Sequence, residues 1–335
     1  MGRVEEEMRR RGRRALASLR ADPAAPTANP DAEAQGSEDA EAGRDVPAFA
    51  PPPLDATTDA PTRQLLAKAA EDPGPLLLPA VLSIANQKGG VGKTTTAVNL
   101  GAALAEEGYR TLVIDLDPQS NATTGLGINS RDIQASVYDV VMNNTGLDDC
   151  IEPTSLKNLF IAPATIDLAG AEIELVPAFS RELKLRRAID EIRDDYDIAL
   201  IDCPPSLGLL TINGLAAADG VLVPIQCEYY ALEGLGQLLR NVSLVRSNLN
   251  PLLEVRGIVL TMYDARTRLA DQVVDEVRTH FGKRVYSTVV PRTVRLSEAP
   301  SFGQPIIVFD STSRGAKAYR ELAKEVSRDA KRRTG

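Results

Sequence analysis

Histidine and cysteine are scarce in this sequence of 335 residues, which contains one histidine and three cysteines. The cysteines, Cys150, Cys203 and Cys227, are odd in number and far apart, so they indicate neither a disulfide framework nor a zinc site and disfavour an iron–sulfur cluster. The single histidine, His280, lies in a stretch with helical periodicity, and we interpret it as structural rather than catalytic.

Long apolar runs are also missing. No stretch reaches the roughly 18 apolar residues that a membrane-spanning helix needs. No apolar core of a signal peptide follows the N-terminus. The sequence therefore predicts a cytoplasmic protein.

The N-terminal part of the chain has a composition that opposes folding. Residues 21–62 contain eight prolines and nine acidic residues, against one basic residue, Arg44, and one aromatic residue, Phe49. Such a segment cannot bury enough apolar surface to offset the entropy lost on ordering. We therefore expect residues 1–79 to form a disordered extension, followed by one large α/β domain over residues 80–335.

A basic arm begins this extension. Residues 3–20 contain seven arginines, with Val4, Met8, Ala15 and Leu19 spaced as a helical apolar stripe. This composition fits either a basic amphipathic helix that contacts DNA, anionic lipid or a protein partner, or a solvated arm without fixed structure. The partner of the extension is unknown.

Apolar runs alternate with helical periodicity from Val81 to the end of the chain. Near-continuous apolar runs predict strands buried on both faces, at 81–85, 111–115, 158–162, 197–202, 220–225 and 256–261. Helical patterns lie between and after them, at 94–107, 181–193, 207–217, 231–248, 270–281 and 315–331. The alternation predicts a doubly wound α/β fold with a mostly parallel sheet, whose ligands bind beyond the carboxyl ends of the strands.

A glycine-rich segment joins the first predicted strand to the first predicted helix. Backbone N–H groups of such a turn cradle phosphates, and the dipole of the following helix adds to the attraction. Lys93 is expected to neutralise the outer phosphates, and the Thr94 hydroxyl to complete a Mg²⁺ shell. The segment therefore predicts the nucleotide-phosphate and Mg²⁺ site of a P-loop NTPase, formed by Gln87, Lys88, Gly89, Gly90, Val91, Gly92, Lys93, Thr94 and Thr95.

Two further predicted strands end in carboxylates. Asp115 and Asp117 are two residues apart at a strand end, so their side chains point the same way, towards the predicted phosphate site. Asp202 closes an apolar run, as in the Walker B pattern, where the carboxylate holds Mg²⁺ through water. Without the glycine-rich segment, Asp115–Pro118 would be read as an ordinary strand-exit turn. With it, we predict a metal site at Thr94, Asp117 and Asp202.

The glycine-rich segment departs from the ordinary P-loop at its start, where Gln87 replaces a glycine and a second lysine, Lys88, follows. In this respect it resembles the deviant Walker A ATPases. That resemblance implies that Lys88 reaches across a dimer interface to the partner's nucleotide, so that two chains enclose two ATP molecules. It also implies that Asp117 orients the attacking water and that the segment from there to Asn121 senses the nucleotide.

Three further segments, 226–234, 260–267 and 291–300, resemble those of ParA-type (Soj-like) chromosome partition ATPases, and the resemblance extends from about Val81 to Val326. It implies that the regions of Met262 and Pro291 line the adenine pocket.

The same resemblance implies that Arg266 and Arg295 contact the DNA backbone in the ATP-bound dimer. The protein is acidic overall, with a net charge of −8, but residues 256–320 carry eleven Lys or Arg against six Asp or Glu. A local basic excess can bind phosphates whatever the global charge. We therefore add three basic neighbours to the expected DNA surface: Lys283, Arg284 and Arg292.

The resemblance implies a nucleoid-associated ATPase. We expect its hydrolysis to be slow without a partner, because no arginine stands where an intrinsic arginine finger would be expected. A ParB-type centromere-binding protein would stimulate it during chromosome or plasmid partition. The main alternative is a MinD-type regulator of division-site placement that cycles on membranes, although basic residues make the C-terminus a weak anchor and no stable anchoring is expected. A metabolic enzyme with the same loop, such as a nitrogenase iron-protein relative or an amide-forming ligase, is the second alternative.

Overall fold

The computed structural model describes residues 64–65, 67, 74–129, 131–228, 233–328 and 330–332. The basic arm at 3–20 and almost all of the predicted extension lie outside these residues. Leu76 and Leu78, which precede the predicted start of the domain at residue 80, are buried in its core.

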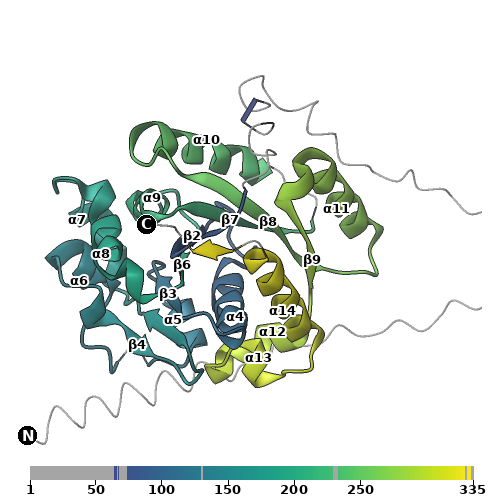
Figure 1. The fold of residues 1–335 in the computed structure, drawn as a ribbon, viewed down its shortest axis with the longest axis horizontal. Helices are drawn as coiled ribbons and strands as arrows, with labels where there is room; N and C mark the ends of the chain where they lie inside the picture. The colour runs from purple at the N-terminus through teal and green to yellow at the C-terminus, as the bar shows by residue number, and fades with distance from the viewer. Residues whose placement is uncertain are drawn as a thin grey trace, which may run out of the picture. The chain divides into compact units, whose positions relative to one another are not determined.

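An eight-stranded sheet organises the described residues, in the order β4-β5-β3-β6-β2-β7-β8-β9 (Figure 1). Every neighbouring pair is parallel except β4 with β5. The strands are β2 Ala80–Ile84, β3 Thr111–Asp115, β4 Glu152–Pro153, β5 Leu159–Ala162, β6 Ile198–Asp202, β7 Gly220–Gln226, β8 Glu254–Tyr263 and β9 Val285–Pro291, with β1 Leu77–Leu78 and β10 Lys331–Arg332 forming a separate parallel pair.

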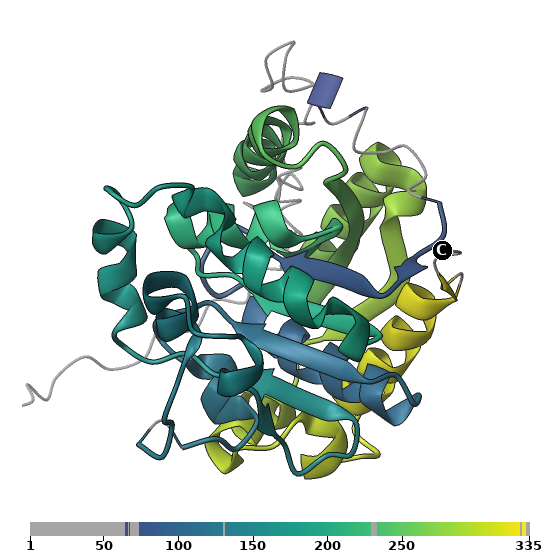
Figure 2. The ribbon, with the colours of Figure 1, turned by 60° about the vertical axis from the view of Figure 1, so that its left-hand side comes forward.

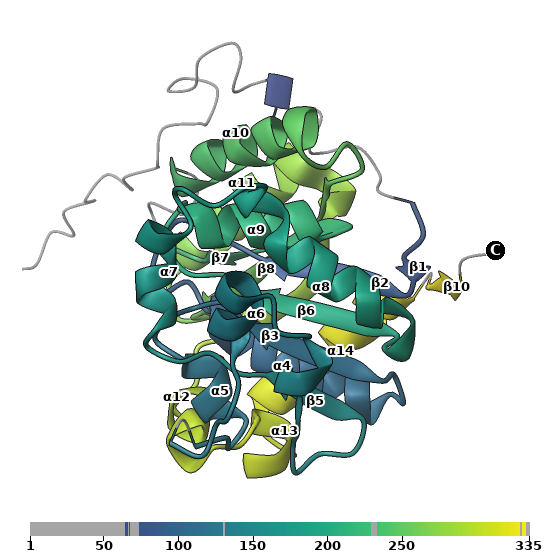
Figure 3. The same cartoon turned by 90° about the vertical axis from the view of Figure 1, so that its left-hand side faces the viewer.

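Helices cover both faces of the sheet (Figure 2). A separate apolar cluster is buried on each face. One layer contains α4 Lys93–Glu106, α5 Asn121–Gly125, α12 Val294–Glu298, α13 Ile306–Phe309 and α14 Arg314–Ser327. The other contains α6 Val137–Asn143, α7 Leu168–Glu174, α8 Lys184–Ile192, α9 Leu209–Ala217, α10 Glu233–Asn248 and α11 Arg268–Phe281 (Figure 3). The predicted doubly wound α/β class is confirmed.

The six predicted strands are present, and none has an end displaced by more than two residues. Strand β9 was not predicted, because the half-buried Tyr286 and Thr288 and the exposed Ser287 interrupt its apolar residues. The last predicted helix, 315–331, was too long at its end. Helix α14 stops at Ser327, and residues 331–332 pair with β1 instead.

Helix α4 lies very close to the centre of the sheet. A Cβ atom on Gly101 would come within 2.9 Å of Val113 Cγ2 on β3 and 3.4 Å of Leu159 Cδ1 on β5. The absence of a side chain at this position therefore lets the helix approach the strands, and this packing fixes the N-terminal end of α4 at the carboxyl edge of the sheet.

Replacing Gly101 with valine is expected to destabilise the fold by roughly 1–3 kcal/mol, because the added side chain forces the helix away from β3. Urea denaturation followed by circular dichroism measures this change. Glu107→Val, at the exposed end of the same helix, is the control. Equal stabilities of the two variants would contradict close packing at Gly101.

Candidate functional site

The glycine-rich segment turns directly into the N-terminus of α4. Gly90 and Gly92 have φ values of 74° and 88°, a left-handed conformation that glycine adopts without strain. Gly92 is the N-cap of α4, and no side chain caps the helix. The first N–H groups of a helix have no intrahelical partner. They therefore face the mouth of the loop as a site for an anion.

Lys93 is held over this loop. Its side chain is buried, and its ammonium donates a hydrogen bond to the Lys88 carbonyl oxygen at 3.2 Å. Burial lowers the pKa of the Lys93 ammonium, while the charges of Asp202 and Asp117 oppose that shift. The ammonium is thus desolvated beside carboxylates, which favours its binding to phosphate.

The Lys88 side chain contacts a different group from that of Lys93. Its ammonium lies 4.0 Å from Glu228, and its side chain is about one-third exposed. Its backbone N–H donates to Asn86 Oδ1 at 3.0 Å, and the Asn86 amide donates to the Pro224 carbonyl at 2.7 Å. Asn86 therefore ties the start of the loop to β7, and the Lys88 ammonium lies near Glu228, two residues beyond the end of that strand.

Three buried carboxylates lie at the neighbouring ends of β3 and β6, with Asp115 and Asp202 opposite each other in the strand register. Asp115 accepts hydrogen bonds from Thr123 N and Oγ1 at 2.8 and 2.7 Å and from Asp117 N at 3.2 Å. Burial raises the pKa of Asp115 to about 6, against the effect of those hydrogen bonds.

Asp202 is less well satisfied. Burial and the nearby Asp115 raise the pKa of Asp202 well above its ordinary value, and the Thr94 hydroxyl and Lys93 ammonium offset this only in part. Within the described ranges, neither of its carboxylate oxygens lies in a well-formed hydrogen bond. A buried carboxylate in this state requires a proton or a cation.

Mg²⁺ fits this arrangement. Among the residues that the structure describes, no group of three or more His, Cys, Asp or Glu side chains could hold a metal ion by itself. Mg²⁺ typically binds through one or two carboxylates and takes its remaining ligands from substrate phosphates and water. Thr94, Asp202 and Asp117, beside a phosphate loop, provide that donor set.

The predicted adenine-pocket residues lie beside the same loop. Thr261 Oγ1 donates to the Val91 carbonyl at 2.8 Å and so joins the end of β8 to the loop. Met262 follows with a left-handed φ of 52°, and its Cε lies 3.9 Å from where a Cβ of Gly92 would be. Pro291, at the end of β9, is the register partner of Tyr263. The two regions are therefore adjacent.

Most of the predicted DNA-binding residues are displayed at the surface. The Arg266 side chain is 87% exposed and makes a bidentate pair with Asp264, at 2.8 and 2.6 Å. Arg295 on α12 pairs with Glu298 at 3.2 Å and Asp310 at 3.6 Å. Arg292 and Lys283 are exposed. Each acidic partner competes with a phosphate for its arginine.

Arg284 does not fit the predicted surface. It is 5% exposed, in the turn between α11 and β9, and its charge interacts with the half-buried Glu254. A buried guanidinium is not accessible to a DNA backbone, so we exclude Arg284 from the DNA surface. Its sequence context, directly after Lys283, gave no sign of this burial.

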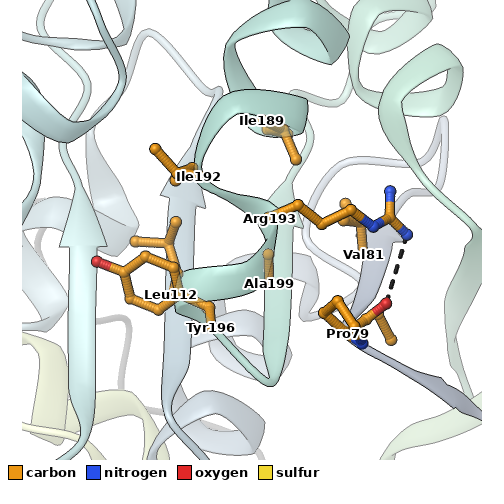
Figure 4. Close-up of a pocket in the computed structure, with 9 residues that line it drawn as sticks. Pro79, Val81, Leu112, Ile189, Ile192, Arg193, Tyr196 and Ala199 are labelled. Atoms are coloured by element: carbon orange, nitrogen blue, oxygen red, sulfur yellow. Dashed lines mark hydrogen bonds between the residues drawn. The ribbon is translucent and has the colours of Figure 1, made fainter. Parts of the chain in front are cut away.

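A small cavity lies at the opposite end of the sheet. The cavity at the amino ends of β2 and β6 measures about 10 Å³. Its lining is mainly apolar, and Arg193 spans it to donate to the Pro79 carbonyl at 3.4 Å (Figure 4). Such a space holds one water molecule at most.

Replacing Asp202 with asparagine is expected to stabilise the nucleotide-free protein. The raised pKa means that the folded protein binds the Asp202 proton more tightly than the unfolded chain does, so the wild type loses stability as the pH rises from the unfolded value of about 3.9. The variant removes that loss. Its melting temperature should exceed the wild-type value by several degrees at pH 7.5, and by less at pH 5, in the presence of a chelator.

The exposed Asp194→Asn variant is the control for loss of one negative charge. A melting temperature for Asp202→Asn at or below the wild-type value at pH 7.5 would contradict the description of Asp202 as a destabilising buried carboxylate.

Comparison with known proteins identifies the family of this chain. A family model described as an AAA domain matches residues 80–255. The chain is 58% identical to the sporulation initiation inhibitor protein Soj of Bacillus subtilis, over 74% of this chain and 98% of that protein. It is 52% identical to the chromosome partitioning protein ParA of Myxococcus xanthus, over 79% of this chain and 94% of that protein.

A solved structure extends the comparison. Cobyrinic acid a,c-diamide synthase from Mycobacterium smegmatis, solved with ADP or an ATP analogue and magnesium, is 41% identical, with a TM-score of 0.66 and coverage of 74% of this chain and 94% of that chain. With a matching domain model over half of its length and partition proteins above 50% identity, the chain belongs to the Soj/ParA family of chromosome-partitioning ATPases.

Proposed function

We propose that this chain is a Mg²⁺-dependent ATPase that switches between a monomer and an ATP-sandwich dimer, and that the dimer binds double-stranded DNA without sequence preference. A ParB-type centromere-binding protein stimulates its slow hydrolysis, and repeated release and rebinding on the nucleoid separate replicated chromosomes or plasmids. The observation that carries this proposal is the buried, unsatisfied Asp202 carboxylate beside a phosphate loop with two lysines.

The loop binds the phosphates of the nucleotide, and the carboxylate cluster binds its Mg²⁺. Backbone N–H groups of Gly89 to Thr95 and the Lys93 ammonium bind the phosphates. Thr94 and Asp202 hold Mg²⁺, which neutralises charge on the phosphate oxygens when bound. Met262 and Pro291 flank the base. The raised pKa of Asp202 returns towards its ordinary range when a cation lies beside it.

Asp117 is placed to orient the attacking water. One of its carboxylate oxygens accepts a hydrogen bond from Gln119 N at 2.9 Å, which fixes the side chain at the start of the segment that leads to α5. Among the described residues its other oxygen makes no hydrogen bond, so it is available to a water molecule in front of the phosphates. Asp117 therefore combines a catalytic position with a direct link to the nucleotide-sensing segment.

Lys88 completes the site of a second copy of the chain. Its ammonium forms a weak, part-exposed pair with Glu228 at 4.0 Å. Release of that pair frees the ammonium to reach phosphates across a dimer interface. Dimerisation and hydrolysis then depend on the same residue.

DNA binding is assigned to four exposed basic residues, of which Arg266, Arg292 and Arg295 follow the carboxyl ends of β8 and β9 and Lys283 lies at the amino end of β9. Contacts of this kind engage phosphates rather than base edges, so binding is independent of sequence and falls steeply with salt. The residues outside the structure, including the basic arm at 3–20, have no partner assigned.

A MinD-type membrane cycle is less well supported. That function needs an amphipathic helix free to lie on a membrane, but the apolar side chains of α14, Tyr319, Leu322 and Val326, are buried against the sheet layer. No helix in the described part of the chain is long and apolar enough to cross a membrane.

An amide-forming enzyme is the other alternative, since the diamide synthase is a structural relative. An enzyme that releases nitrogen from glutamine through a cysteine needs a reactive thiolate. All three cysteines here are buried, and burial raises the pKa of each thiol to about 12. The chain's own cysteines therefore do not supply that chemistry.

Replacing Lys88 with alanine is expected to prevent dimerisation without preventing ATP binding. The variant should bind ATP with nearly the wild-type affinity, because Lys93 and the loop remain, but it should stay monomeric and lose at least about tenfold in ATPase rate. Equilibrium binding of a fluorescent ATP analogue and light scattering measure the two properties. Lys157→Ala, in an exposed loop, is the control. ATP-dependent dimers of the Lys88 variant would contradict a role in trans.

Reversing the charge of Arg266 should abolish retention on DNA and leave ATP-driven dimerisation intact. Arg187→Glu makes the same charge change on the exposed face of α8, in the other helical layer, and should retain DNA. Gel-shift titrations at several salt concentrations test both. Loss of dimerisation in Arg266→Glu, or equal DNA loss in both variants, would show that Arg266 is not a specific DNA contact.

A further inference from the structure

The segment that follows the catalytic carboxylates touches the segment that carries Arg295. After Asp117 the chain enters α5 and reaches Gly127, which packs directly on Gly303, at the end of the 3₁₀ turn Ala299–Phe302 that continues α12. Both glycines have positive φ values, 83° and 63°.

The contact is between backbones. A Cβ atom on Gly303 would lie 2.9 Å from Gly127 Cα and 3.4 Å from the Thr124 carbonyl oxygen, and a Cβ on Gly127 would lie 2.9 Å from the Gly303 carbonyl oxygen. Backbone atoms cannot turn away as a side chain can. A displacement of α5 towards the turn must therefore move the turn as well.

The two ends of this contact lead to the two sites. On one side, Thr123 anchors α5 to Asp115 at the carboxylate cluster, and its hydroxyl also accepts a hydrogen bond from Ala164 N at 3.0 Å. On the other side, the turn continues α12, where Arg295 is held by Glu298 and Asp310.

Space for movement lies beside the contact. A cavity of about 270 Å³ separates the N-terminal turns of α4 from α5 and from the 3₁₀ turn, with walls that include Thr95, Asn121, Thr124 and Pro300. The Ile306 N–H donates to Asn99 Oδ1 at 2.6 Å and fixes α13 to α4 on the far side of the turn. The α12 segment is thus tethered beyond the turn but has room on the side of α5.

We propose that the Gly127–Gly303 contact couples the nucleotide state to DNA binding: movement of α5 on ATP binding displaces the 3₁₀ turn and α12, and so releases Arg295 from Glu298 and Asp310 towards DNA. The coupling rests on the proposed function, since it needs an ATP site at Asp117 and a DNA surface that includes Arg295. The coupling also requires that α5 occupy one position with ATP and another with ADP.

Gly303→Ala and Gly127→Ala test the coupling, because each inserts a methyl group into the contact. The ratio of DNA affinity with ATP to that with ADP, of the order of 5- to 150-fold for coupled sites, should fall towards one in these variants. ATP affinity and ATP-dependent dimerisation should stay within about threefold of wild type. Gly108→Ala, with a φ of 99° but no atom within 4 Å of the added Cβ, controls for backbone strain and should keep the wild-type ratio.

The wild-type protein provides a second measurement that does not depend on the folding of a variant. Hydrogen–deuterium exchange without DNA should change at residues 294–303 together with residues 119–128 when ADP is replaced by ATP. Unchanged exchange at 294–303, or a wild-type ratio of DNA affinities in well-folded Gly303→Ala, overturns the coupling. Absence of ATP-dependent DNA binding in the wild type would instead overturn the proposed function.

Discussion

The site depends on an electrostatic conflict between three buried carboxylates. Asp115, Asp117 and Asp202 lie together at the ends of β3 and β6, and two of them are fully buried. Asp115 is stabilised by three hydrogen bonds. Neither carboxylate oxygen of Asp202 lies in a well-formed hydrogen bond within the described residues. This arrangement is unfavourable for folding alone and becomes favourable when a cation and its phosphates are bound. The same unfavourable charge that weakens the empty protein therefore strengthens its binding of Mg²⁺ and nucleotide.

Much of this site was predictable from local sequence. The glycine-rich segment, the carboxylates at strand ends and the buried parallel strands depend on neighbours in the chain, and the strands were predicted to within two residues at each end. The bare N-terminus of α4 follows from the same local pattern, because Gly92 cannot cap a helix with a side chain.

Other features depend on contacts between distant segments. Thr123 holds Asp115 across eight residues, Thr261 joins β8 to the loop across 170, and Gly303 meets Gly127 through their backbones. No local pattern indicates such pairs. The burial of Arg284 was also not predictable from local sequence. It depends on how α11 and β9 pack, whereas the sequence shows only the basic pair Lys283-Arg284, which predicted an exposed residue.

The central claim is that nucleotide binding at the carboxylate cluster controls retention on DNA. The most direct measurement is binding to non-specific duplex DNA with ADP and with ATP, using wild type and the slow-hydrolysis variant Asp117→Ala. Our account predicts binding with ATP only, stronger in the variant, and lost at high salt. Equal binding with both nucleotides, or no binding in either state, would contradict it.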